Sequence, residues 1–429
     1  MNILVLGGGG REHAIGWALA KSPKCEKLYM APGNGGTSEI AENVSGLNAE
    51  DGQAVLAFVQ EHDVSLVVIG PEAPLVAGVA DVLREAGIDV FGPSAEGAQL
   101  EGSKDFSKQF MMRNDIPTAA YATFSDAESA IAYVQEQGAP IVVKADGLAA
   151  GKGVVVAETV EEAVAAVRNC FDGAFGAAGA TVVIEECMFG PECSLFSFVS
   201  NGMSYPMTPA QDHKRAYDGD KGPNTGGMGS YSPVPIVTDD EMAAMCEIMQ
   251  KAAAATKAEF ALDYRGTLYG GFMLTKQGPK IVEFNARFGD PETQCVLSRL
   301  DADLVDIMVA VAQGRPEDVH VSWSEKWAAC VVLASAGYPG SYEKGKVITG
   351  ISEAEELAGV KVFHAGTKIN EAGELVTSGG RVLNVVALAD SFDEARAQAY
   401  RACDLIQFEG KQMRTDIGAK AAKGRSAWE

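Results

Sequence analysis

Short apolar runs and amphipathic segments alternate along the first hundred residues. Residues 3–6 and 65–69 are almost wholly apolar, whereas residues 12–21 repeat apolar positions at helical spacing. Strand-length apolar runs that alternate with helical segments predict a parallel, doubly wound α/β sheet. Ligands bind such sheets at the carboxyl ends of the strands. The turn-forming segments 7–10 and 70–74 follow two predicted strands, so we expect both at this edge.

The middle of the chain has the pattern of a small α+β unit within a larger one. Strand and helix patterns over residues 120–190 surround a glycine-rich loop at 146–153. Two strand patterns at 267–275 and 280–285 are joined by a turn, which predicts a hairpin. The segment 208–235 combines Gly and Pro with polar residues, which predicts a long functional loop.

These changes of pattern predict three domains and a mixed α/β and α+β fold. We expect an N-terminal α/β domain over residues 1–101 and a central domain over 102–326, with a small lid subdomain at about 120–190. A C-terminal β-rich domain over 327–429 ends in a predicted helix at 391–406.

The composition excludes two classes of binding partner, nucleic acids and membranes. The 429 residues include 35 Lys and Arg against 58 Asp and Glu, a net charge of -23, so the surface repels nucleic-acid phosphates. No apolar run approaches the about 18 residues of a membrane span, and the N-terminus lacks the pattern of a signal peptide. The 8 cysteines include no CxxC motif, which indicates reduced thiols rather than a zinc site. We therefore expect a cytoplasmic protein that binds neither nucleic acid nor membrane.

Gly7 to Glu12 resemble a dinucleotide-binding turn, but Glu12 stands where GxGxxG needs its last glycine. Backbone N–H groups at a helix start still form an anion site, and Arg11 adds a positive charge. We therefore expect a phosphate group here. The alternatives are a purely structural tight turn and an Arg11 that pairs with Glu12 or Glu72.

The segment Gly147 to Gly153 resembles a Walker A loop but has one residue too few between its glycines, and Gly153 replaces Ser or Thr. A glycine loop flanked by Lys144 and Lys152 is suited to fold over a triphosphate as a lid. The alternative is a hairpin with solvated lysines.

Strand alternation places Glu283 and Asn285 on one face, with Phe284 on the other. A carboxylate and an amide oxygen on one face suit Mg²⁺, which shares oxygen ligands with phosphates. The alternative is a half-exposed strand edge. Glu185 to Met188 end another predicted strand, where hinge backbone groups read an adenine edge; solvated acids are the alternative there.

Taken together, these motifs resemble the phosphoribosylamine–glycine ligase (glycinamide ribonucleotide synthetase) family. The matching segments, in chain order, are Gly-Gly-Arg-Glu-His at 9–13, Gly-Pro-Glu-Ala-Pro-Leu at 70–75, Lys-Ala-Asp-Gly-Leu-Ala-Ala-Gly-Lys-Gly at 144–153, Gln-Asp-His-Lys-Arg at 211–215, Gly-Pro-Asn-Thr-Gly-Gly-Met-Gly at 222–229, Arg-Phe-Gly-Asp-Pro-Glu-Thr-Gln at 287–294, His-Ala-Gly-Thr at 364–367 and Gly-Gly-Arg-Val at 379–382.

The resemblance implies an ATP-grasp core and a carbon–nitrogen ligase of purine biosynthesis. Such an enzyme joins glycine to 5-phosphoribosylamine with ATP and Mg²⁺ or Mn²⁺, through glycyl phosphate. It implies small-molecule partners only, and we expect a monomer. The alternatives are another ATP-grasp carboxylate–amine ligase and, from a different class, a nicotinamide-dependent oxidoreductase.

The resemblance also implies a role for individual residues. Glu283 and Asn285 bind the metal, and Arg287, Asp290 and Lys144 are catalytic. The nucleotide is held by Lys104, Lys144, Lys152, Glu185, Glu186, Met188 and Glu192. The substrates are held by Gly9, Gly10, Arg11, Glu72, Asp212, Lys214, Arg287, Asp290, Gly380 and Arg381.

The hinge departs from the family pattern, and the motif histidines differ in the roles that they fit. The hinge carries Cys187-Met188 where the family usually has Phe-Leu, which alters the adenine wall. His13 and His364 fit structural roles, whereas His213 is equally compatible with a structural and a functional role.

Overall fold

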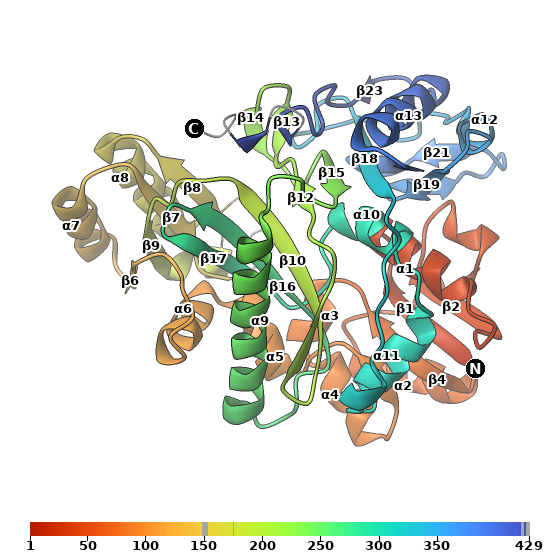
Figure 1. Ribbon diagram of the computed structural model, residues 1–429, viewed down its shortest axis with the longest axis horizontal. Helices are drawn as coiled ribbons and strands as arrows, with labels where there is room; N and C mark the ends of the chain where they lie inside the picture. The colour runs from red at the N-terminus through yellow and green to blue at the C-terminus, as the bar shows by residue number, and fades with distance from the viewer. Residues whose placement is uncertain (148–152, 175, 422–423, 426–429) are drawn as a thin grey trace.

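The computed structural model describes residues 1–147, 153–174, 176–421 and 424–425, and its N-terminal part is a parallel sheet (Figure 1). The strand order is β3–β2–β1–β4–β5. The strands are β1 (Asn2–Gly7), β2 (Lys27–Pro32), β3 (Glu42–Asn43), β4 (Val64–Ile69) and β5 (Asp89–Phe91). The helices between and after them are α1 (Gly10–Ala20), α2 (Gly52–Glu61), α3 (Glu72–Val76), α4 (Val79–Glu85) and α5 (Ala95–Gly102).

Alternate residues of β1 pack into two different cores, which confirms the doubly wound sheet. Ile3 and Val5 join α1 and α11 (Leu304–Ala312) in one core. Leu4 and Leu6 join α2 and α4 in the other. Because both faces of the sheet are buried at its centre, β1 and β4 are nearly continuous apolar runs.

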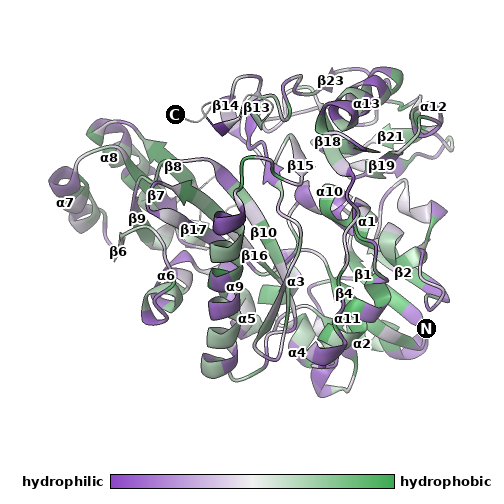
Figure 2. Ribbon diagram, viewed as in Figure 1, coloured by the Kyte–Doolittle hydropathy of each residue, from purple (hydrophilic) through white to green (hydrophobic). Residues whose placement is uncertain are grey.

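Two antiparallel sheets form the middle of the chain. The lid sheet has the order β6–β9–β7–β8, from β6 (Tyr121–Phe124), β9 (Val182–Glu186), β7 (Ile141–Ala145) and β8 (Val154–Ala157). Helices α7 (Ala127–Gln137) and α8 (Val160–Asn169) cover one of its faces. Figure 2 shows hydrophobic residues along β7 and β8 and hydrophilic residues on α7.

The central sheet has the order β11–β10–β16–β17. Its strands are β10 (Glu192–Ser200), β11 (Met203–Pro206), β16 (Gly266–Thr275) and β17 (Gly278–Asn285). Leu195 and Val199 of β10 pack against α9 (Asp239–Glu259), whereas Phe196 and Phe198 face the N-terminal sheet. The N-terminal and middle parts of the chain therefore share a continuous core.

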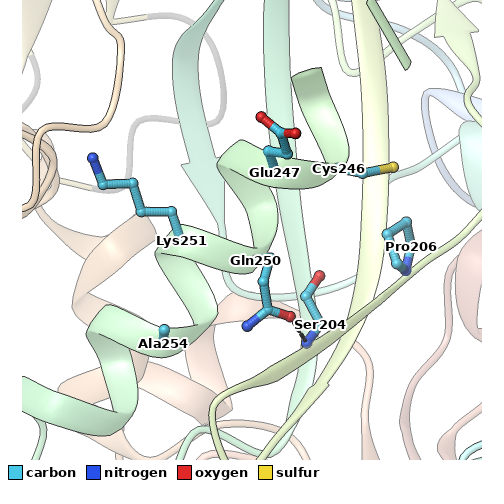
Figure 3. A pocket seen from close by; sticks show the side chains of 7 residues that line it. All are labelled: Ser204, Pro206, Cys246, Glu247, Gln250, Lys251 and Ala254. Atoms are coloured by element: carbon cyan, nitrogen blue, oxygen red, sulfur yellow. Dashed lines mark hydrogen bonds between the residues drawn. The ribbon is translucent and has the colours of Figure 1, made fainter. Parts of the chain in front are cut away.

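An open groove of about 510 Å³ lies between β11 and α9 (Figure 3). In it, the Gln250 amide binds the outer edge of the sheet: Ser204 N–H donates to Oε1 at 3.0 Å, and Nε2 donates to the Gly202 carbonyl at 2.9 Å. An uncovered strand edge is a template for pairing with another chain. Gln250 therefore occupies one N–H of β11 and one carbonyl of the turn before it.

We expect Gln250→Leu to increase self-association and to lower the free energy of unfolding by about 1–3 kcal/mol, because it leaves backbone groups unpaired. Sedimentation velocity and urea unfolding measure the two effects. Glu247→Gln, a substitution in the same groove, is the matched control. A Gln250→Leu protein that sediments and unfolds like this control would contradict the expectation.

The C-terminal sheet has the order β12–β15–β18–β22–β19, and β23 (Lys411–Gln412) also pairs with β18. Strands β18 (Trp327–Ser335), β19 (Val360–His364) and β22 (Arg381–Ala389) come from the expected C-terminal region. Helices α12 (Ile351–Glu355) and α13 (Phe392–Leu405) pack against this sheet, beside the hairpin of β20 (Thr367–Ile369) and β21 (Leu375–Thr377).

The expectation of a loop over residues 208–235 is wrong in part, because short strands interrupt it. This segment forms β12 (Gln211–Asp212), β13 (Arg215–Tyr217), β14 (Lys221–Asn224) and β15 (Gly229–Ser232). Strand β15 pairs with β18 through backbone hydrogen bonds, which require no apolar pattern in the sequence of β15. Among the described residues, no helix has the length and apolar character needed to cross a bilayer.

Candidate active site

A buried carboxylate joins two lysines where the lid sheet meets the central sheet. Glu185, on β9, contacts Lys144 Nζ at 2.8 Å and Lys108 Nζ at 2.9 Å. Lys144, on β7, also donates to the Val282 carbonyl of β17 at 3.4 Å. Because charged groups rarely lie inside a protein without partners, this triad is a strongly specified feature.

Sequence reasoning missed Lys108, whose side chain is 2% exposed. It lies on α6 (Lys104–Arg113), four residues after Lys104, and donates to Thr118 Oγ1 at 2.8 Å. Burial has the largest effect and lowers the pKa of Lys108 to about 8, although the negative charge of Glu185 acts to raise it. Its spacing from Lys104 was the available signal, because residues four apart share a helix face.

Lys104 lies at the start of α6 and beside the glycine-rich loop. Its Nζ donates to the Gly147 carbonyl at 2.8 Å, and its backbone N–H donates to Asp146 Oδ1 at 2.5 Å. Ser103 caps the helix by accepting from Phe106 N–H at 3.1 Å. Lys152 and the rest of the loop at 148–152 lie outside the described residues, so the lid remains a prediction.

Glu283 and Asn285 lie on one face of β17, whereas Phe284 is buried in the core beneath α9, which confirms the alternation. Burial acts to raise the pKa of Glu283, but nearby Lys214, Lys144, Lys104 and Arg287 outweigh it and hold the pKa below its ordinary value. In the described part of the chain, no donor lies within ion-pair or hydrogen-bond distance of this carboxylate.

An ionised carboxylate among cations, without a direct partner, fits a divalent ion bound together with phosphates. The described residues contain no group of three or more His, Cys, Asp or Glu side chains that would hold a metal unaided. A divalent ion held by Glu283 and Asn285 would take further ligands from the phosphates of a nucleotide, as Mg²⁺ sites commonly do. The residues present fit this arrangement.

Arg287 follows these two residues and is held by two carboxylates. Its guanidinium contacts Glu101 at 2.7 Å and Glu72 at 3.5 Å, and it lies 3.5 Å from Asn285 Oδ1. Sequence reasoning named Glu72 but missed Glu101, which also accepts from Ala286 N–H at 2.9 Å. Contact with Glu72 links Arg287 to the edge of the N-terminal sheet.

Lys214 forms an ion pair with Glu192 at 2.5 Å, although we expected the two to bind different substrates. Burial raises the pKa of nearby Asp212 to about 7, against the opposing charge of Lys214. Another buried set lies close to them, in which Ser194 Oγ donates to Glu292 at 3.1 Å and bonds Tyr269 at 2.9 Å. Sequence reasoning did not identify Ser194 or Tyr269.

The glycine turn of the N-terminal sheet is packed closely around Glu12. Gly9 N–H donates to Glu12 Oε2 at 2.7 Å, and Arg11 Nε donates to Oε1 at 2.5 Å. Arg11 also donates to the Phe288 carbonyl at 3.0 Å and is buried. These contacts match the alternative in which the Arg11 side chain is structural. At Gly10, an added Cβ would lie 2.1 Å from Asn384 Nδ2, so a larger residue would displace this buried amide.

Asp290 connects this turn to the C-terminal sheet. Its Oδ2 lies 3.4 Å from both Arg11 N–H and Arg381 NH2, and Oδ1 accepts from Gln294 at 2.8 Å. Arg381 additionally donates to the carbonyls of Asp290 at 2.8 Å and Gly226 at 2.6 Å. Asp290, Arg381 and the Gly9–Gly10 turn therefore form one neighbourhood, and Gly380 is adjacent to it in the chain.

At the hinge, Glu186 is exposed and contacts Lys280 at 3.4 Å. Its backbone N–H donates to the Ala120 carbonyl at 2.9 Å and is already used by the fold. Met188 is partly buried, and Phe189 beside it is 70% exposed. The Glu186 N–H is therefore not free to bond an adenine edge.

The motif histidines pack into the fold. His13 Nδ1 accepts from His364 N–H at 2.9 Å, and His364 Nδ1 bonds Thr367 Oγ1 at 3.1 Å. Burial lowers the pKa of His13 to about 3, helped by the positive charge of His364, and burial lowers the pKa of His364 to about 4. His213 Nε2 accepts from Gly418 N–H at 3.0 Å, which favours its structural alternative.

These shifts predict that acid destabilises the protein. Between about pH 6.5 and 4, His13 and His364 are protonated in the unfolded chain but not in the folded one. The free energy of unfolding therefore decreases as the pH is lowered, by up to about 1.4 kcal/mol per pH unit for each histidine. The free energy of unfolding of His13→Gln, measured with urea at several pH values, should fall less steeply as the pH is lowered, by about this amount per pH unit. His320→Gln, at an exposed position, is the control. An unchanged slope in His13→Gln would refute the assignment.

Comparisons with known proteins agree with this geometry. Models of the phosphoribosylglycinamide synthetase family match the N domain at residues 1–101, the ATP-grasp (A) domain at 102–293 and the C domain at 328–420. The chain is 49% identical over 427 residues to phosphoribosylamine–glycine ligase from Brucella melitensis, and the alignment covers 100% of both chains.

Solved structures extend the comparison. Phosphoribosylamine–glycine ligase from Thermotoga maritima is 35% identical with a TM-score of 0.84, covering 97% of this chain and 100% of that one. Biotin carboxylase from Campylobacter jejuni, solved as a beta-gamma-ATP complex, is only 16% identical but has a TM-score of 0.75 over 98% of this chain and 95% of that one. The second likeness shows a shared fold.

A lid sheet set against a central sheet, with Lys144, Glu185 and Glu283 at their junction, defines an ATP-grasp protein, a class that binds ATP. Within that class, the chain belongs to the phosphoribosylglycinamide synthetase family. The resemblance inferred from the sequence motifs is confirmed.

Proposed function

We propose that this protein is the carbon–nitrogen ligase that joins glycine to 5-phosphoribosylamine, using ATP, in purine biosynthesis. The products are glycinamide ribonucleotide, ADP and phosphate. Full-length similarity to proteins named for this reaction supports the proposal. The observation that carries the proposal is the ionised Glu283 carboxylate, which lies among Lys104, Lys144, Lys214 and Arg287. This arrangement suits an electrophilic phosphoryl group that is bound together with a metal ion.

Activation of glycine explains the need for ATP. A carboxylate is a poor electrophile, so its attack on the γ-phosphoryl group first produces glycyl phosphate, and the ribosylamine nitrogen then displaces phosphate. No protein nucleophile is required. Positioning and charge neutralisation supply the catalysis.

We assign the nucleotide end of the site to the lid and central sheets. Lys104, Lys144 and Lys152 neutralise the phosphates, and residues 185–188 with Glu192 contact adenine and ribose. Glu283 and Asn285 hold Mg²⁺ or Mn²⁺, which when bound neutralises phosphate charge. The ion pair between Lys214 and Glu192 supports adding Lys214 to this end of the site.

We assign the amine end to the junction of the N-terminal and C-terminal sheets. The sugar phosphate binds at Gly9, Gly10, Gly380 and Arg381, and Arg11 with Glu72 supports this wall. Arg287 neutralises the transferring phosphoryl group. Asp290 and Asp212 receive the ammonium and amine groups, and the raised pKa of Asp212 suits a group that exchanges protons near neutral pH.

One assay tests the function. ADP release is measured with glycine alone, with phosphoribosylamine alone and with both, and we expect full turnover only with both. Turnover with a different carboxylate or amine in preference would favour another ATP-grasp ligase. Tight binding of NAD without ADP release would favour the oxidoreductase alternative.

A further inference from the structure

The C-terminal segment of residues 414–418 is clamped onto the hairpin of residues 213–228, which includes β13 and β14. Arg414 is 2% exposed and forms hydrogen bonds with Asp416 at 2.7 Å and 2.8 Å. Its NH1 reaches the hairpin, where it donates to Asp220 Oδ1 at 2.9 Å and to the Arg215 carbonyl at 3.1 Å. Asp416 accepts from Gly219 N–H at 2.8 Å, at the hairpin tip.

Further contacts tie the two segments together along their length. Thr415 N–H donates to Asp218 Oδ1 at 2.8 Å near the tip, and Gly418 N–H donates to His213 Nε2 at 3.0 Å at the base. These residues are about 200 positions apart in the chain, so only the folded C-terminal domain brings them together.

The hairpin in turn holds Lys214. Thr225 donates to the Lys214 carbonyl through its N–H at 2.7 Å and through its hydroxyl at 2.9 Å. Lys214 Nζ then reaches Glu192 at 2.5 Å, in the neighbourhood of Glu283. The hairpin has no wide sheet of its own, since β13 and β14 pair only with each other among the described strands. A two-stranded ribbon of this kind is marginally stable without outside contacts.

We propose that Arg414 is a positioning residue that fixes the hairpin and so holds the Lys214 ammonium in the active site. It touches no substrate and acts through Asp220, Asp416 and the Arg215 carbonyl. This inference rests on the proposed function of the site around Glu283.

The test is a double-mutant cycle between Arg414→Gln and Lys214→Met, with kcat/KM for ATP as the readout. Arg414→Gln should lower kcat/KM by roughly ten- to a hundredfold, because small displacements of a charged group are costly in phosphoryl transfer. In the Lys214→Met background, Arg414→Gln should have little further effect on kcat/KM while lowering Tm as much as before. Such non-additivity is the signature of residues that act through one another.

Two more variants complete the design. Arg401→Gln removes an exposed arginine of α13 that bonds Gln398 on the same helix, and it should leave kcat/KM unchanged. Asp220→Asn weakens the contact with Arg414 from the hairpin side but leaves the contact of Arg414 with Asp416, so it should lower kcat/KM by a smaller factor. This variant serves as the test if Arg414→Gln fails to fold.

Hydrogen exchange separates this proposal from the proposed function. Exchange in residues 213–228 should be faster in Arg414→Gln, and in Asp220→Asn, than in wild type. Additive losses in the cycle, or unchanged exchange in the hairpin, would overturn the positioning role. Absence of ADP release from wild type would overturn the proposed function instead, and the exchange measurement would still decide whether Arg414 holds the hairpin.

Discussion

Glu283→Gln should lose most of its turnover while keeping its fold. The substitution removes the carboxylate charge that lies among Lys214, Lys144, Lys104 and Arg287. A metal ion that neutralises a transferring phosphoryl group contributes several kcal/mol, so a loss of about 3–5 kcal/mol corresponds to a fall in kcat of roughly a hundred- to several-thousand-fold. Initial rates of ADP release at saturating substrates measure it.

Glu283→Gln should stay folded but melt at a lower temperature, because the surrounding cations lose the opposing charge that holds the pKa of this carboxylate below its ordinary value. Glu325→Gln makes the same chemical change at an exposed position and should keep wild-type turnover. If Glu283→Gln retained near-normal kcat, the metal assignment would be wrong. If it failed to fold, the carboxylate would be structural.

Glu185→Gln should cost more stability than any other single charge removal in the site. It leaves Lys108 and Lys144 buried without their shared carboxylate, and breaking a buried ion pair by removing one partner typically costs about 3–5 kcal/mol. Free energies of unfolding are only about 5–15 kcal/mol, so this substitution removes a large part of the total stability. Urea unfolding at pH 7 measures this loss.

The loss in Glu185→Gln should shrink as pH rises. An unpaired buried lysine avoids its charge by releasing a proton, which from an unfolded pKa near 10.4 costs about 4.6 kcal/mol at pH 7 but only about 1.9 kcal/mol at pH 9. Lys108 already has its pKa lowered to about 8 by burial, despite its pairing with Glu185. Stability of the variant relative to wild type should therefore recover between pH 7 and 9.

Glu186→Gln is the matched control, since Glu186 is the next residue but is exposed and contacts Lys280 at 3.4 Å. Surface ion pairs contribute about 0–1 kcal/mol, so its loss should be small at both pH values. Equal losses for Glu185→Gln at pH 7 and 9 would mean that its two lysines are not held as buried charges.

Local patterns in the sequence were sufficient for the elements and for part of the site. Period-two alternation placed Glu283 and Asn285 opposite Phe284, and the apolar run of residues 3–6 predicted a strand buried on both faces. The Ser103 cap of α6 is likewise a local feature. Such features follow from the geometry of one strand or one helix end, which depends on neighbours in the chain.

Other features depend on which distant segments meet. The spacing of Lys108 from Lys104 places both on one face of a helix, but it does not identify Glu185 as the partner of Lys108. Nothing in the sequence identifies Glu101 as the partner of Arg287, because the partner of a charged side chain depends on the fold. The strands within residues 208–235 were hidden for a related reason, since backbone bonds to β18 stabilise β15 whatever its side chains.

The sequence alone thus determined the class of fold, the order of its domains and the residue types available for phosphate and metal binding. The tertiary structure alone decided their long-range pairing: Lys214 with Glu192, and Arg414 with a hairpin about 200 residues away. The physical reason is that secondary structure follows short-range periodicity, whereas buried charges are satisfied by whichever opposite charges the packed domains bring within reach.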